Sequence, residues 1–280
     1  MPVYQTPESI DVIIELSAGD IRVTAADRTD TVVEVRTSDE NDASDVEAAG
    51  QIRVDYTDGT LRVTGPKRMF DFSRKTRSVE VTIALPTDSR LSGKVDAGDY
   101  RCTGRLGKSS LKLSAGNVRV ERTGALHVDV SAGHVTADEI AGDADIHTGT
   151  GRVRIGAVGG GAVIKNSNGD TTVETVAGDL RVRSANGEIQ VGNAGAGVDA
   201  KTSNGAIRLG RVNGGAITLA SGNGDLDVGI AEGVAAWLEV NTGFGHVRND
   251  LTSTSGPAGD GRTVEVRGRT AFGDVLIHRA

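Results

Sequence analysis

The sequence has few of the residues that build disulfide-rich domains or aromatic binding clefts. Its 280 residues include five prolines, four Phe, three Tyr, one Trp and one cysteine, Cys102. A single cysteine excludes an internal disulfide. No aromatic residue occurs between Arg101 and Ala236. Carbohydrate-active sites commonly use aromatic side chains as platforms, so this gap argues against such a site in the middle of the chain.

Long apolar runs are also missing. No stretch approaches the roughly 18 apolar residues of a membrane-spanning helix. The first residues, MPVYQTPESIDVIIELSAGD, lack the basic start and long apolar segment of a signal peptide. These features predict a cytoplasmic protein without a membrane span. The formal charge of −7 and the pI near 5.3 argue against general nucleic-acid binding, because the phosphates would be repelled.

Glycine is abundant, with 39 residues, and many of them recur at a fixed interval. Asn168-Gly169, Asn186-Gly187 and Asn204-Gly205 are 18 residues apart, and Asn223-Gly224 follows after 19. Towards the N-terminus, Gly151, Gly133 and Gly116 continue the series at steps of 18, 18 and 17. A fixed period of this size is typical of repeat architectures.

Apolar residues alternate with polar ones on both sides of these glycines, as in strands with one buried face. The positions five before the glycine are Ile146, Ile164, Val182 and Ala200. One coil alone cannot bury such a face, so successive coils must stack. The sequence predicts an all-β fold, a single-stranded parallel β-helix (β-solenoid) of about 18 residues per coil, in which Ile164, Val182 and Ala200 form one axial column. Right-handed crossovers dominate parallel β topology, so we expect a right-handed solenoid.

The Asn-Gly pairs suit tight corners because Gly, and to a lesser degree Asn, tolerate positive φ. We interpret Asn168, Asn186, Asn204 and Asn223 as a structural turn ladder in which stacked amides hydrogen-bond along the axis. A row of ligand-binding amides is the alternative interpretation.

The pattern divides the chain into three continuous parts. Residues 1–90 form an N-terminal β segment or cap, residues 91–230 the regular coils, and residues 231–280 the C-terminal coils and cap. In the first part, Asp58-Gly59 predicts a hairpin. Residues 38–50 indicate a solvated acidic loop or, through the spacing of Ser44 and Glu47, a capping box that opens a short helix.

Two groups of aromatic residues are expected near the ends of the solenoid. A basic loop with aromatic residues either covers an open end of the core or serves as a partner loop; its residues are Lys67, Arg68, Phe70, Phe72, Arg74 and Lys75. We expect Trp237, Phe244 and Phe272 to plug the C-terminal end.

The modules Ser17-Ala18-Gly19-Asp20 and Ser167-Asn168-Gly169-Asp170, with the closing modules around Phe244 and Phe272, resemble those of a bacterial β-strand-repeat family. That family is known as domain of unknown function four-zero-nine-seven and carries the label putative adhesin. The resemblance extends from about residue 12 to 277. It implies a single-stranded β-helix and no established catalytic residues.

The function classes can be weighed on the same residues. No nucleophile-elbow, Walker or zinc-protease motif occurs, and the carboxylates at Asp170, Glu174, Asp179 and Glu188 show no recurrent pairing, so we expect no catalytic residues and no cofactor. The five histidines fall at different positions of the repeat, so we expect no metal site. We expect a non-enzymatic β-solenoid scaffold or interaction protein with protein partners. A polysaccharide-acting enzyme is the least favoured alternative.

One outward position carries mostly cations. Four residues before the repeat glycine stand Lys112, His147, Lys165, Arg183 and Lys201, interrupted by Asp129. Stacked at the strand spacing of about 4.8 Å, they predict a basic row that binds an anionic polymer or glycan. Asp145 and Asp199 are expected to neutralise it in part. Self-association through the unpaired β edges at the solenoid ends is a separate hypothesis.

Overall fold

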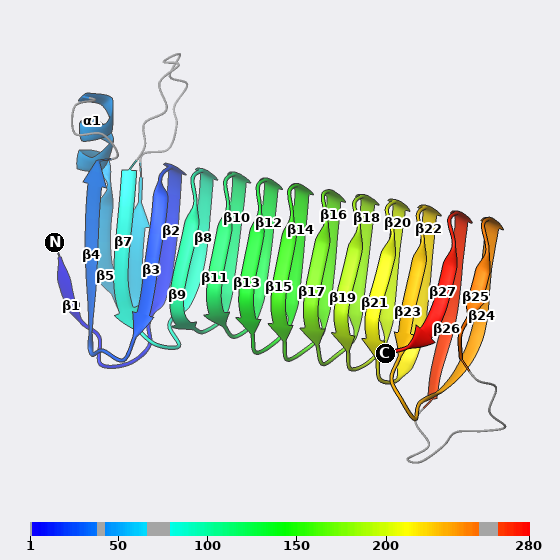
Figure 1. The fold of residues 1–280 in the computed structure, drawn as a ribbon. Helices are drawn as coiled ribbons and strands as arrows, with labels where there is room; N and C mark the ends of the chain where they lie inside the picture. The colour runs from blue at the N-terminus through cyan, green and yellow to red at the C-terminus, as the bar shows by residue number, and fades with distance from the viewer. Residues whose placement is uncertain (1, 38–42, 66–78, 252–262) are drawn as a thin grey trace. The chain divides into compact units, whose positions relative to one another are not determined.

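The computed structural model describes residues 2–37, 43–65, 79–251 and 263–280, and it divides into two compact units, Met1–Glu139 and Ile140–Ala280. In each unit, sequential strands alternate between two mainly parallel sheets, which confirms the β-solenoid (Figure 1). A regular coil contributes two strands, one to each sheet, joined at the repeat glycine.

Unit 2 contains the most regular coils. Its strands are β14 (Ala144–Thr150), β15 (Val153–Val158), β16 (Ala162–Asn168), β17 (Thr171–Val176), β18 (Leu180–Asn186), β19 (Ile189–Ala194), β20 (Val198–Asn204), β21 (Ile207–Val212), β22 (Gly215–Asn223), β23 (Leu226–Ile230), β24 (Ala235–Phe244), β25 (Val247–Asn249), β26 (Thr263–Phe272) and β27 (Val275–Arg279). One sheet has the order β14-β16-β18-β20-β22-β26-β24, and the other β15-β17-β19-β21-β23-β27-β25.

The expected axial column is present. Ile164 pairs with Val182, and Val182 pairs with Ala200, in parallel register. All three side chains are fully buried. Because residues 18 apart stack directly, most inward positions become ladders of compact aliphatic side chains that fill a narrow core.

The repeat glycines are required by close approach as well as by conformation. Gly205 has a φ of +143°, where side chains are strained. A Cβ added there would lie 2.0 Å from the carbonyl oxygen of Gly187, the equivalent glycine of the neighbouring coil. The corners of successive coils thus stack backbone on backbone, with no room for a methyl group.

The last two coils of unit 2 are not stacked in chain order. β26 lies between β22 and β24, pairing in parallel with both, and β27 lies between β23 and β25. In Figure 1 the C-terminal strands, drawn in red, separate β22 and β23 from β24 and β25. The final segment of the chain is therefore inserted, and β24 and β25 form the outer edges of the two sheets.

Unit 1 is built in the same way but has a different edge. Its elements are β1 (Val3–Gln5), β2 (Asp11–Ala18), β3 (Asp20–Ala26), β4 (Asp30–Thr37), α1 (Ala43–Gln51), β5 (Arg53–Thr57), β6 (Thr60–Thr64), β7 (Val79–Pro86), β8 (Arg90–Ala97), β9 (Tyr100–Leu106), β10 (Ser109–Ala115), β11 (Val118–Thr123) and β12 (Leu126–Ala132), with β13 (Val135–Ile140) reaching its boundary. β2 and β3, first in the sequence, pair in parallel with β8 and β9 on one side and with β6 and β7 on the other.

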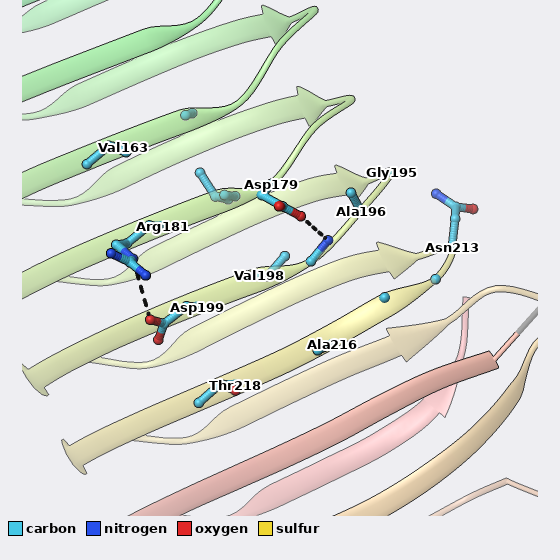
Figure 2. A pocket seen from close by; sticks show the side chains of 15 residues that line it. Val163, Asp179, Arg181, Gly195, Ala196, Val198, Asp199, Asn213, Ala216 and Thr218 are labelled. Carbon is cyan, nitrogen blue, oxygen red and sulfur yellow. Dashed lines mark hydrogen bonds and ion pairs between the residues drawn. The ribbon is translucent and has the colours of Figure 1, made fainter.

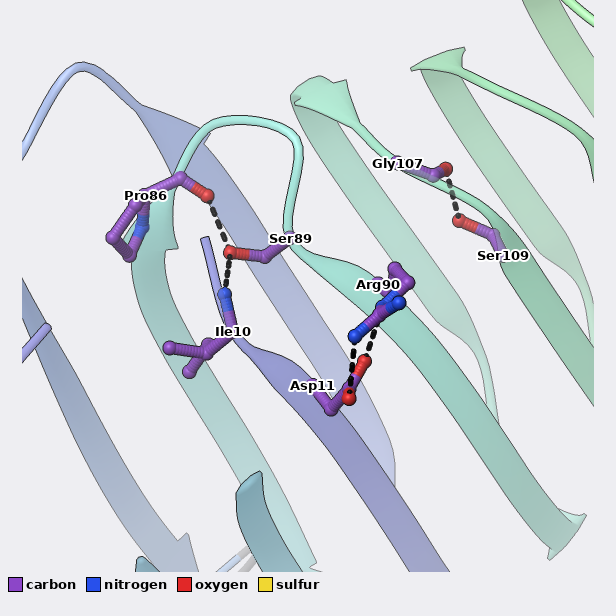
Figure 3. A network of polar contacts seen from close by, with 7 residues as sticks. All are labelled: Ile10, Asp11, Pro86, Ser89, Arg90, Gly107 and Ser109. Atoms are coloured by element: carbon purple, nitrogen blue, oxygen red, sulfur yellow. Dashed lines mark hydrogen bonds and ion pairs between the residues drawn. The ribbon is translucent and has the colours of Figure 1, made fainter. Parts of the chain in front are cut away.

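Polar contacts fasten this inserted coil to the turn before β8 (Figure 3). Ser89 accepts a hydrogen bond from the backbone N–H of Ile10 at 3.1 Å and donates one to the carbonyl of Pro86 at 2.7 Å. Beside them Arg90 forms a two-point ion pair with Asp11. Since Ser89 is fully buried, its hydroxyl satisfies backbone groups that water cannot reach.

Antiparallel strands and a helix close the outer edge of unit 1. β4 pairs antiparallel with β7, β1 with β4, and β5 with β6. The expected hairpin at Asp58-Gly59 joins β5 to β6, with φ values of +49° and +74°. α1 contacts β4 and β7 and buries Ala48. A helix, and not a loop, therefore occupies residues 43–51; the Ser44 side chain lies outside the described residues.

The C-terminal aromatic residues do not plug the core. Trp237, Phe244 and Phe272 are 55%, 71% and 54% exposed. Phe244 and Phe272 stack with ring centroids 4.9 Å apart, in the column that Asn204 and Asn223 occupy farther along the sheet. The expectation of a plug was wrong because these residues fall at outward and corner positions of their coils.

Candidate functional site: a cationic face and its groove

The predicted basic row lies on one sheet face of unit 2. Its members His147, Lys165, Arg183 and Lys201 are direct neighbours on β14, β16, β18 and β20. The next position on β22 is Ala220, which ends the row. Lys112 belongs to unit 1, where its neighbours are Lys94 and Asp129. Whether the row binds a ligand stays a prediction.

Asp199 partly neutralises the row, as expected. Its carboxylate forms an ion pair with Arg183 and lies 3.8 Å from Lys201 Nζ and 3.7 Å from Arg181 Nε. Partial burial alone would raise the pKa of Asp199. The hydrogen bond from Arg183 and the charges of Arg183, Lys201 and Arg181 outweigh it, so the pKa lies below its usual value. Asp199 is therefore a stable anion among three cations.

The other members of the row differ in their partners. His147 Nε2 lies 3.1 Å from Asp145 Oδ1, and Lys112 Nζ lies 2.9 Å from Asp129 Oδ2. Lys165 forms no ion pair within 4.0 Å with any carboxylate of the described ranges. The face around Lys165, Arg181, Arg183 and Lys201 thus holds more positive than negative charge in a chain whose formal charge is −7.

A groove of about 820 Å³ adjoins this face (Figure 2). Arg181, Asp199 and Asp179 line it together with small residues of three successive corners. The groove lies where the repeat lengthens, because the extra residue of the 19-residue step falls between Val212 and Ile217. Arg181 and this groove were not identified from the pattern, although the step from 18 to 19 residues marks the place.

Asparagine amides form the turn ladder along one corner of unit 2. Asn186 donates to Asn168 Oδ1 at 2.8 Å, and Asn204 donates to Asn186 Oδ1 at 2.9 Å. Asn223 lies beside Asn204 in the same register. The side-chain amides of Asn186 and Asn204 are used within the ladder, which supports a structural role for it.

A second polar column, inside the same corner, was not recognised in the sequence. In the coils of Gly224 and Gly273, the residue three before the glycine is buried and donates a hydrogen bond to a glycine carbonyl of the neighbouring coil. Ser221 donates to Gly205 O at 2.9 Å, and Thr270 donates to Gly224 O at 2.8 Å. From Gly151 onward a Ser or Thr recurs three residues before the glycine, with Asn166 as the exception, and this recurrence was the available signal.

The turn carboxylates also have structural partners. Asp170 and Asp179 each accept a backbone N–H of the next coil at 3.0 Å, from Glu188 and Gly197. Glu188 forms an ion pair with Arg208, and Glu174 lies 3.5 Å from Arg154. Each of these four carboxylates thus contacts a backbone N–H group or an arginine, and none is paired with a second carboxylate.

No group of three or more His, Cys, Asp or Glu side chains is arranged to hold a metal ion within the described ranges. The helix found there, α1, is too short to cross a membrane.

Cys102 is buried in the core of unit 1 beside the equally buried Tyr100. Burial raises the pKa of the Cys102 thiol to about 12, and burial, followed by the charge of Cys102, raises that of Tyr100. A thiol that stays protonated is a poor nucleophile. Cys102 therefore packs as a small apolar residue.

The proposed partner loop, residues 67–75, lies outside the described residues.

A family model described as Toastrack DUF4097 matches residues 10–256. Similar solved structures include a putative adhesin from Bacteroides fragilis (16% identity, 99% of this chain and 95% of that chain, TM-score 0.36). Others are a putative adhesin from Parabacteroides merdae (15%, 81% and 95%, 0.46) and a putative cell adhesion protein from Clostridium sporogenes (12%, 100% and 98%, 0.27). A comparison with curated proteins finds no match.

Proposed function

The chain belongs to the Toastrack DUF4097 family, and from that premise we propose that it is a non-enzymatic interaction protein whose solenoid faces bind partners. The observation that carries this proposal is the strict register of the coils. It turns outward side chains into continuous columns on a rigid sheet, as His147, Lys165, Arg183 and Lys201 illustrate. Solenoids use such extended, regular surfaces for binding.

Cross-linking mass spectrometry on the full chain tests this proposal. Partners captured from cells of the source organism should cross-link to outward positions of successive strands on one face. Turnover of a polysaccharide panel by the purified chain would contradict a non-enzymatic role.

A second candidate is specific to the cationic face: it binds a linear anionic polymer, such as an acidic polysaccharide. Three observations favour it. The cations are spaced at the strand repeat of about 4.8 Å, Asp199 offsets only part of their charge, and Lys165 lacks an ion pair among the described residues. An extended polymer could follow such a row with one charge per coil.

Charge reversal separates this candidate from non-specific attraction. Lys165→Glu, Arg183→Glu and Lys201→Glu together should reduce binding of a polyuronate at least tenfold, and the wild-type affinity should fall with salt. A matched control reverses Arg101, Arg119 and Lys108, which lie in unit 1. Equal losses in both triple variants would reduce the effect to net charge and exclude a site on this face.

A further inference from the structure

At the outer edge of unit 2, core positions are exposed that in the interior coils of the unit are covered by a neighbouring coil. β24 and β25 each have one neighbouring strand, and no described strand pairs with their other side. Ile217 and Val266 are fully buried, whereas Leu238, the next residue in the same column, is half-buried. Trp237 and Val247 are exposed beside it. This edge therefore combines unpaired backbone groups with an incompletely covered apolar core.

We propose that the same edge of a second copy of this chain covers it, through antiparallel pairing of β24 with β24 and of β25 with β25. The edge formed by a regular coil is best covered by another regular coil. The outer edges of unit 1 offer none, because β1 and β5 are short strands of three and five residues that pair antiparallel. The partner that fits β24 and β25 is thus a second β24 and β25, in a two-fold symmetric contact.

The repeat phase gives one position for the two-fold axis on both strands. Val240 stands five residues before Gly245 and Asn249 four residues after it. Ile164 and Val173 hold the same places around Gly169, and both are buried in the core of one coil. Val240 and Asn249 therefore hold corresponding places on the two strands of one coil, and a single two-fold axis can pass through both.

Charges are complementary about this axis. Arg248 lies opposite the partner subunit's Asp250, and Asp250 lies opposite the partner subunit's Arg248. Within one chain, Arg248 on β25 pairs with Asp250, the residue directly after the strand, at 2.9 Å. On β24, Glu239 lies opposite the partner subunit's Asn241, so no like charges face each other. Antiparallel strands tolerate such cross-strand pairs and are destabilised by like charges.

Aromatic residues would add apolar contact on the outside of the same edge. Phe244 is held against Phe272 with an interplanar angle of 6°, and Arg267 lies 5.9 Å from the centre of the Trp237 ring. Exposed side chains that are already ordered by such contacts lose little entropy when they are covered. The contact is isologous and therefore closes at two copies, so it predicts a dimer and not an open-ended polymer.

A single cysteine tests the axis. Asn249 is exposed and would lie beside the partner subunit's Asn249, within the distance that a disulfide spans. Asn249→Cys in the full chain should form a covalent dimer under mild oxidation. The native Cys102 is buried and does not compete for the new thiol. Lys201→Cys, on an interior strand, is the control and should stay monomeric on a denaturing gel.

Sedimentation across a concentration series provides the second readout. The wild type should show a monomer–dimer equilibrium, weakened at least tenfold by Val240→Lys and unchanged by Thr172→Lys. Arg248→Asp and Asp250→Arg should each weaken the dimer, and the double swap should restore it. A monomer at every concentration, or polymers larger than a dimer, would overturn the proposal. Neither result bears on ligand binding to the sheet faces, so this inference stands apart from the proposed function.

Discussion

The outer edges of the two units solve the same problem differently. A solenoid coil that is last in its stack exposes strand edges and one side of the core. In unit 1, antiparallel strands and α1 cover that coil, and Leu61 beneath them is fully buried. In unit 2, the last coil is an ordinary parallel coil whose Leu238 stays half-buried. The comparison separates a completed edge from one that is open to association.

Truncating the equivalent leucines gives the largest expected contrast. Leu61→Ala should lower the free energy of unfolding by about 2–5 kcal/mol, because it leaves a cavity beneath a covered edge. Leu238→Ala should cost less, about 1–2 kcal/mol, because part of its side chain is already exposed to water. Denaturant unfolding at a concentration that keeps the chain monomeric measures both. Equal losses would show that the edge of unit 2 is covered in solution.

Replacing one alanine at each edge by a charged residue is a second test of the difference between the two edges. Ala48 on α1 is buried, so Ala48→Glu should destabilise the chain by about 2 kcal/mol as the carboxylate loses water. Ala236 on β24 is only half-buried, and Ala236→Glu should cost less than about 0.5 kcal/mol. Thermal unfolding of the two variants provides the test. A harmless Ala48→Glu would mean that α1 contributes little to closing its edge.

The repeat period was sufficient to predict the stacking of coils but not the order at either edge. Ile164, Val182 and Ala200 follow from an 18-residue step and an alternating pattern. The modules at Gly245 and Gly273 are nearly identical, so periodicity alone cannot tell which of them stacks on Gly224. Chain order suggested Gly245; the structure places Gly273 there. Long-range pairing decides this, and short local motifs carry no information about it.

The candidate site could be predicted from the sequence to a similar extent. The repeat phase placed Lys165, Arg183 and Lys201 in one row, and Asp199, two residues before Lys201, was expected to offset part of their charge. The groove depends on the detailed path of the corner at Asn213 to Gly215, where the added residue changes the turn. The period locates that irregularity but gives neither its shape nor the side chains that surround it.

Removing one hydroxyl from equivalent corners should give a smaller effect. Thr202 in an interior coil is buried and donates to Asn204 O at 3.2 Å, so Thr202→Val should cost about 1 kcal/mol. Thr242 in the outermost coil donates to Gly273 O at 2.8 Å but is partly exposed, and water can replace its bond. Thr242→Val should therefore cost about half as much in urea unfolding. The reverse order would contradict the open edge.

The smallest expected effect on stability is that of replacing Asp199. The folded-state pKa of Asp199 lies below its unfolded value, so its contribution to stability is present above the unfolded pKa and is lost as pH falls through the folded pKa. Asp199→Asn should cost less than about 1 kcal/mol at neutral pH, and the difference from wild type should vanish in acid. Asp250→Asn, at the exposed edge, should change stability less still. Unfolding at a series of pH values distinguishes the two.

The insertion of β26 between β22 and β24 is what makes β24 an edge strand. Paired cysteines measure it directly, since neighbouring strands lie within disulfide distance. Thr218 pairs with Arg267 of β26, and Arg267 separates it from Glu239 of β24. Thr218→Cys with Arg267→Cys should cross-link within one chain, whereas Thr218→Cys with Glu239→Cys should not. Cross-linking of the second pair and not the first would place β24 inside the stack and contradict the open edge.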